Sequence, residues 1–276
     1  MDGRQFEIGI RRLADSLSYG TDHSRFLGSG IEYVQSRPYE AGDPVRNIDW
    51  RVTARTDKFY IKEFESTKRM PCYLLFDTSA SMTISSHAKS KYATALHIAG
   101  GLAFACLDRV SPVGIVGVGE SGLRMRPSLS KAQIMQWLTG LCRFRYDEST
   151  SLARQIRELS PSLTQRVLII VLSDLHDAEA LLALKRLVQL HDLVVLQFQD
   201  PAEEGVRGSG FVRAREAETG QDFVSRGGRG RLDQDLVNRE LRRSGIDHLR
   251  IRTDRPYVHA LRHFFEARGV LGRTAR

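Results

Sequence analysis

Long apolar runs, cysteine pairs and several common enzyme motifs are missing from this sequence. Its longest uninterrupted apolar run, residues 167–172, is far too short to cross a bilayer, and the first 15 residues contain no signal-peptide core. There is no Walker A motif and no Gly-x-Ser-x-Gly motif of a nucleophilic serine. We therefore expect a cytoplasmic protein without a membrane span.

Cysteine is scarce, with 3 residues in a chain of 276. Cys72, Cys106 and Cys142 form no Cys-x-x-Cys pair and no Cys/His spacing typical of zinc sites. Each lies in an apolar stretch, which favours buried, reduced thiols.

Positive charge is in excess, with a formal net charge of +8 that comes mostly from arginines spread along the chain. The densest cluster is at residues 226–231. A mildly basic surface suits an acidic protein partner. Nucleic-acid binding through residues 143–146 and 226–231 is the alternative, and it would weaken steeply with salt.

Apolar segments of strand length alternate with segments of helical periodicity over most of the chain. Strands are predicted at 73–76, 113–118, 167–172, 193–198 and 248–251, and helices at 89–109, 131–142, 152–159, 178–190, 232–243 and 257–267. This alternation predicts an α/β fold with a Rossmann-like, doubly wound, mainly parallel sheet.

Two segments fall outside the alternation. Residues 1–66, with a turn-rich stretch at 37–44 and a strand at 59–64, are predicted to form an N-terminal extension. Residues 207–226 have the pattern of a β-hairpin inserted into the main domain, which we place at 67–270, followed by a tail at 271–276.

Acidic and hydroxyl side chains follow two of the apolar strands where each ends. Asp77, Ser79 and Ser81 come after the strand at 73–76 with the spacing Asp-x-Ser-x-Ser, and Asp174 follows the strand at 167–172. If these parallel strands are neighbours, both groups lie in one crevice at the carboxyl edge of the sheet. Thr150, in the loop before the helix at 152–159, offers another hydroxyl. Such hard oxygen donors suit Mg²⁺ or Mn²⁺ better than Zn²⁺ or Cu²⁺. Helix capping is the structural alternative for each of them.

These residues resemble the three loops of the metal-ion-dependent adhesion site of von Willebrand factor A domains. A series of upstream residues narrows the resemblance: Arg37, Tyr39, Gly42, Asp43, Arg46, Ile48, Asp49, Trp50, Ala54 and Arg55. With them the chain resembles the bacterial family named domain of unknown function 58, over about residues 25–270.

The resemblance implies a von Willebrand factor A-like domain and a bound Mg²⁺ or Mn²⁺. It implies that the ion is held, in part through water, by Asp77, Ser79, Ser81, Thr150 and Asp174. It also implies a non-enzymatic adaptor that works with a MoxR-type AAA+ ATPase in the assembly of protein complexes. Because two carboxylates leave a divalent cation with an open position, we expect an acidic side chain of a protein partner to complete its coordination.

The upstream residues have two interpretations. One is a structural network of arginines and aspartates in which a buried Trp50 joins the N-terminal extension to the core. The other is a docking surface for the ATPase, formed by Arg37, Tyr39, Asp43, Arg46, Asp49, Trp50 and Arg55.

A metal-dependent phosphohydrolase is the enzymatic alternative. Hydrolases of the haloacid-dehalogenase kind also place an aspartate after the first strand, but they use a second acid two residues later. That position is Ser79 in this sequence. We therefore expect no enzymatic activity.

Overall fold

The computed structural model describes the chain in two compact units, Met1–Thr21 with Met70–Arg276 and Asp22–Arg69. The residues that it describes are 3–18, 32–40, 42–43, 45–65, 70–83, 85–119, 123–143, 151–177, 179–201, 211–215, 222–226 and 234–268.

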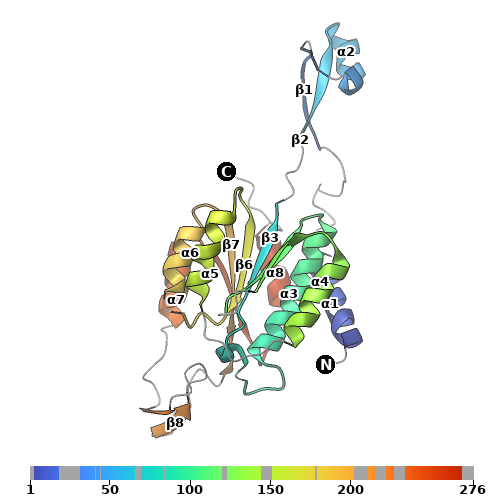
Figure 1. The fold of residues 1–276 in the computed structure, drawn as a ribbon. Helices are drawn as coiled ribbons and strands as arrows, with labels where there is room; N and C mark the ends of the chain where they lie inside the picture. The colour runs from blue at the N-terminus through green and yellow to red at the C-terminus, as the bar shows by residue number, and fades with distance from the viewer. Residues whose placement is uncertain are drawn as a thin grey trace. The chain divides into compact units, whose positions relative to one another are not determined.

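A six-stranded sheet forms the centre of the larger unit (Figure 1). Its order is β10-β7-β6-β3-β4-β5, and all neighbours are parallel except β4 and β5. The five parallel strands confirm those predicted from the apolar runs. The antiparallel edge strand β5 was not predicted, because its sequence Arg-Met-Arg-Pro-Ser has no apolar run. The strands are β3 (Cys72–Phe76), β4 (Val113–Gly117), β5 (Arg124–Ser128), β6 (Leu168–Ser173), β7 (Asp192–Gln199) and β10 (Asp247–Arg252).

Helices cover both faces of this sheet, as expected for a doubly wound architecture. Alternate residues of each strand face opposite sides: Leu74 and Phe76 of β3 belong to one apolar core, and Leu75 belongs to the other. The first core contains side chains of α1 (Gly3–Ser18), α3 (Lys91–Asp108), α4 (Lys131–Cys142) and α8 (Val258–Ala267). The second contains side chains of α5 (Leu152–Leu159), α6 (Ala180–Leu187) and α7 (Gln234–Arg243).

Helix α1 corrects the predicted division of the chain at residue 66. It belongs to the larger unit and packs on α3, so residues 1–66 do not form one N-terminal extension. Glycines of α3 allow the close approach: a Cβ atom at Gly100 would lie 2.4 Å from Ile10 Cδ1, and one at Gly101 would lie 2.6 Å from Leu13.

The smaller unit is built on two antiparallel strands, β1 (Glu32–Pro38) and β2 (Tyr60–Glu65). Between them lie the 3-10 helix η2 (Val45–Asn47) and the helix α2 (Trp50–Thr56). The strand predicted at 59–64 is confirmed. The interpretation with a buried Trp50 is wrong, because 64% of that residue's surface is exposed. Trp50 is the first residue of α2, where the cap Asp49 is buried instead.

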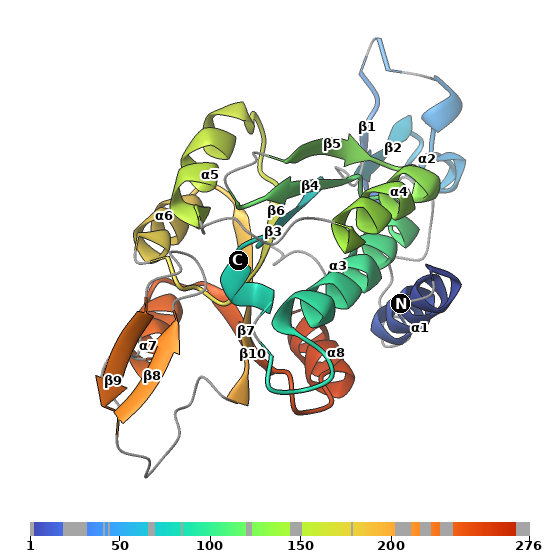
Figure 2. The same cartoon turned by 60° about the horizontal axis from the view of Figure 1, so that its bottom comes forward.

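The predicted hairpin is confirmed in its two strands, β8 (Phe211–Arg215) and β9 (Asp222–Arg226), which pair antiparallel (Figure 2). Cys72 and Cys106 are buried as expected, whereas Cys142 is exposed at the end of α4. Among the described helices, none combines the length and apolar character needed to cross a membrane.

Candidate functional site

The predicted site lies at the point where the topology of the sheet changes direction. β3 has β4 on one side and β6 on the other. The helix that follows β3, α3, covers one face, whereas the helix that follows β6, α6, covers the other. The loops after these two strands therefore diverge, and ligands of open α/β sheets bind at such a switch point. Asp77 follows β3 and Asp174 follows β6, so the structure brings the two predicted carboxylates to this point.

Asp77 is fully buried and held by hydrogen bonds. Its Oδ1 accepts one from the backbone N–H of Ser79 at 3.0 Å, and its Oδ2 accepts one from the hydroxyl of Ser173 at 2.5 Å. The short 3-10 helix η3 (Ala80–Thr83) turns the chain directly afterwards. Ser79 Oγ and Ser81 Oγ lie 3.0 Å apart, so the Asp-x-Ser-x-Ser spacing places both hydroxyls together.

Asp174 contacts a cation that the sequence did not indicate. Its Oδ2 lies 2.7 Å from Lys91 Nζ, and neither side chain is exposed to solvent. His176 Nε2 lies 3.6 Å from the same oxygen. Lys91 is the first residue of α3, directly after the N-cap Ser90. Only the packing of α3 against β6 brings it to Asp174, so no local sequence signal could have identified it.

Burial dominates the electrostatics of Asp77. Loss of solvent, with the negative charge of Asp174 as the second cause, raises the pKa of Asp77 to about 7, although Ser173 and Ser79 donate hydrogen bonds that act in the opposite direction. A cation at this carboxylate would stabilise its ionised form.

The backbone after Asp174 is strained. Leu175 has a φ of 60°, in the left-handed region that costs a non-glycine residue about 1 kcal/mol or more. Its N–H donates to Ser173 Oγ at 2.9 Å, and its side chain is buried in the second apolar core. Tertiary packing therefore fixes the turn that carries Asp174.

The loop after η3 is anchored across the same edge. Ser86 donates to the buried carboxylate of Asp200 from its backbone N–H at 3.0 Å and from its hydroxyl at 2.5 Å. Thr253 also donates to Asp200 at 3.1 Å. Asp200 follows β7, so three loops at the carboxyl edge are joined by one carboxylate.

Thr150, predicted as a further oxygen donor, lies outside the described residues. The next residue, Ser151, is described at the end of β4: its Oγ lies 3.1 Å from the carbonyl oxygen of Val118 and 3.0 Å from that of Gly119.

The oxygen atoms at this edge fit a hard divalent cation. They comprise the two carboxylates and the hydroxyls of Ser79 and Ser81, which match the preference of Mg²⁺ and Mn²⁺ for oxygen. Asp174 Oδ1 is buried and has no hydrogen-bond partner within the described part of the chain. Across these residues, no group of three or more His, Cys, Asp or Glu side chains is placed to hold a metal. Any ion here would therefore need serine hydroxyls and water in addition to the two carboxylates.

A glycine motif that sequence reasoning overlooked lies at the end of β4. Gly117, Gly119 and Gly122 match Gly-x-Gly-x-x-Gly, the spacing of dinucleotide-binding loops. That function requires a helix after the motif, whereas here the antiparallel strand β5 follows. The N–H of Gly117 donates to the carbonyl of Leu123 at 2.7 Å, so the first glycine of the motif joins the end of β4 to the residue before β5.

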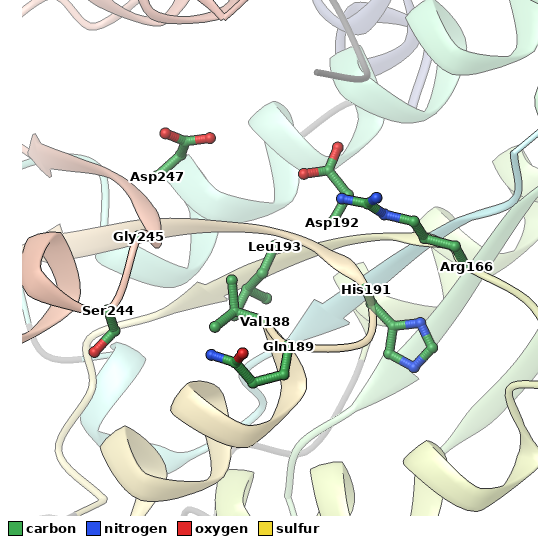
Figure 3. Close-up of a pocket in the computed structure, with 9 residues that line it drawn as sticks. All are labelled: Arg166, Val188, Gln189, His191, Asp192, Leu193, Ser244, Gly245 and Asp247. Carbon is green, nitrogen blue, oxygen red and sulfur yellow. The ribbon is translucent and has the colours of Figure 1, made fainter. Parts of the chain in front are cut away.

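A polar pocket of 210 Å³ lies at the opposite edge of the sheet, where β7 and β10 begin (Figure 3). Asp192 and Asp247 line it, and Arg268 pairs with both carboxylates. This arrangement ties the end of α8 to two strands. The pocket contains none of the predicted site residues.

The upstream residues form a local network within the smaller unit. Arg37 binds Asp43 through two hydrogen bonds of 2.7 Å, and Asp49 caps α2 while accepting a hydrogen bond from Ser36 at 2.7 Å. Both aspartates therefore have structural partners. Of the other residues predicted to dock a partner, Tyr39 is half-buried, and Arg46, Trp50 and Arg55 are exposed.

Fold and site together define an α/β protein with a mainly parallel sheet and an oxygen-rich site at its switch point. The family described as "Protein of unknown function DUF58" matches residues 35–238, and the chain belongs to this family. It is 23% identical over 282 residues to the uncharacterized proteins Mb1516 of Mycobacterium bovis and Rv1480 of Mycobacterium tuberculosis, covering 96% of this chain and 88% of each relative.

A solved structure has a related fold. The conserved hypothetical protein BatB from Bacteroides thetaiotaomicron superposes with a TM-score of 0.50 at 18% sequence identity. The match covers 72% of this chain and 98% of that one. At this level of identity, the likeness supports the α/β architecture alone.

Proposed function

We propose that this protein is a non-enzymatic adaptor that binds Mg²⁺ or Mn²⁺ at the carboxyl edge of its sheet and uses the ion to bind a protein partner. The observation that carries the proposal is the convergence of Asp77, Ser79, Ser81 and Asp174 at the switch point between β3 and β6. Thr150 completes the proposed set of ligands. The strand order and the place of the site also support a von Willebrand factor A-like fold.

The charge at the site supports an acidic partner. A divalent ion with two carboxylates and neutral hydroxyls keeps an open coordination position. At an effective dielectric constant of about 20, a unit charge pair at 4 Å gains roughly 4 kcal/mol before desolvation. That attraction is enough to make binding depend on the metal, but surrounding contacts are needed for a stable complex.

The resemblance to the family of domain of unknown function 58 supports a MoxR-type AAA+ ATPase, either as the bound partner or as a protein that acts together with this one. The process that they would serve is the assembly of protein complexes. The smaller unit offers a surface for such an interaction, formed by the exposed side chains of Arg46, Trp50 and Arg55. We propose that this surface, and not the network of the half-buried Asp43 and the buried Asp49, contacts the ATPase.

Calorimetric titration with Mg²⁺ and Mn²⁺ tests the metal site. We expect saturable binding by the wild type and none by Asp77→Asn, which keeps the shape of the side chain. The control is Asp177→Asn: Asp177 lies on the loop after β6, but its carboxylate accepts hydrogen bonds from the N–H groups of Ala153 at 2.8 Å and Glu179 at 2.9 Å. Equal binding by the wild type and Asp77→Asn would refute the assignment.

The adaptor role is tested with the purified MoxR-type ATPase of the source organism. We expect the wild type to bind it, with weaker binding by Asp77→Asn if the ion contacts the ATPase and by Trp50→Ala if the smaller unit does. Release of phosphate from a general phosphomonoester by the wild type, lost in Asp77→Asn, would instead establish the hydrolase alternative.

A further inference from the structure

Lys91 has no part in the function proposed above, yet it forms a buried ion pair with Asp174. Its side chain is fully buried, and its Nζ lies 2.7 Å from Asp174 Oδ2. Ser90 fixes the start of α3 by accepting a hydrogen bond from the N–H of Ala93 at 3.1 Å. Lys91 is therefore placed by a capped helix that packs on the sheet, and not by a surface loop.

A buried ion pair of this kind calls for a reason beyond stability. Removing two charges from water has a large free-energy cost, so an apolar pair of similar size often stabilises a protein better. Another largely buried cation–carboxylate contact among the described residues, between Arg268 and Asp192, joins the end of α8 to β7 at the opposite edge. Lys91 instead contacts a carboxylate that also faces Asp77.

We propose that Lys91 is a built-in counter-ion, which neutralises Asp174 when no metal is bound and competes with a divalent cation for that carboxylate. This inference rests on the proposed metal site and adds its regulation. With Asp77 and Asp174 ionised, the three side chains carry a net charge of −1. A bound divalent ion changes this net charge to +1. Without the lysine, the two carboxylates and the ion together would be neutral.

Two consequences follow from this count of charges. First, the lysine weakens metal binding, because its ammonium group already neutralises the charge of Asp174 that would attract the ion. Second, the loaded site keeps one positive charge, so an acidic group from a partner binds to a site that is not yet neutral. A protein without a partner would then hold the ion loosely, and the partner and the ion would each strengthen the binding of the other.

The test compares the wild type with Lys91→Met and Lys91→Gln. Methionine removes the charge with little change in length, and glutamine keeps a hydrogen-bond donor toward Asp174 in case the methionine variant does not fold. We expect both variants to melt at a lower temperature than the wild type in EDTA, because Asp174 loses its cation. In calorimetric titrations, we expect the dissociation constant for Mg²⁺ to fall by about tenfold or more.

Arg268→Met is the matched control, because it removes a buried cation from carboxylates at the other edge of the sheet. It should lower the melting temperature equally with and without Mg²⁺ and leave the affinity for the ion unchanged. In the Lys91 variants, by contrast, Mg²⁺ should raise the melting temperature by more than it does in the wild type.

The outcomes separate this inference from the proposed function. Binding of Mg²⁺ by the wild type that is lost in Asp77→Asn, but no tighter in either Lys91 variant, overturns the counter-ion role and leaves the metal site in place. Binding by the Lys91 variants but not by the wild type supports the competition and refutes the proposed function of the natural chain. Absence of binding in every variant overturns both.

Discussion

The burial of Asp77 predicts a pH dependence of stability that a single substitution should remove. Burial raises the pKa of Asp77 from its ordinary value of 3.8 to about 7. Between these values Asp77 is protonated in the folded, metal-free protein and ionised in the unfolded chain, so its contribution to stability is fully present at low pH and is lost as the pH rises. About 3 pKa units at 1.36 kcal/mol each give a loss of about 4 kcal/mol between pH 4 and pH 8.

Asp77→Asn should abolish this loss, because asparagine resembles the protonated acid at every pH. Its side-chain oxygen can accept the hydrogen bond from the N–H of Ser79, and its amide can donate to the hydroxyl of Ser173. In EDTA the variant should be similar in stability to the wild type near pH 4 and more stable by about 4 kcal/mol near pH 8.

Urea denaturation followed by far-UV circular dichroism, at intervals of pH from 4 to 8, measures this difference. Because the two proteins share every other titrating group, the difference between their curves isolates residue 77. Parallel curves would refute the reasoning, since they would mean that Asp77 is ionised in the folded protein throughout. Mg²⁺ should stabilise the wild type most at high pH and should not stabilise Asp77→Asn.

Three further perturbations test other parts of the structure. Burial lowers the pKa of His248 to about 4. Between pH 6.5 and pH 4 the unfolded chain therefore gains a proton at this histidine and the folded protein does not, so this residue should cost the wild type about 3 kcal/mol of stability as the pH falls. His248→Gln should lack this loss in the same denaturation series. Gly100→Ala should destabilise the protein by about 1–3 kcal/mol, because its Cβ would lie 2.4 Å from Ile10 Cδ1. Gly140→Ala should stabilise α4 by up to about 1 kcal/mol, because its Cβ would meet only open space beyond its own helix. Val110 has a φ of 59° after α3, so Val110→Asn should raise the melting temperature, and a lower value would mean that the half-exposed valine side chain contributes more than the backbone strain costs.

The predictability of each element depended on whether its signal was local. β3 and β6 are continuous apolar strands followed by an acid, so their positions, Asp77 and Asp174 could all be predicted from the sequence. Helix α1 also carries a local signal, with Phe6, Ile10 and Leu13 at helical spacing, but the predicted extension obscured it. For Trp50, the residue type led to a wrong prediction. Its size favours burial, yet it begins a short helix in a small unit, and its side chain stays exposed.

The role of Lys91 could not be predicted from a local pattern, because it depends on a contact with Asp174, which lies 83 positions away in the sequence. In isolation it is a polar residue in the first turn of an apolar helix, where a lysine normally reaches solvent. Only when α3 crosses the end of β6 does its ammonium group become the cation of a buried carboxylate. The strand order makes the loops after β3 and β6 diverge, which opens a place for a ligand. It also brings the N-terminus of α3 to that place. A site that holds its own cation can stay folded without metal, and for that reason metal binding there is a step that a partner can control.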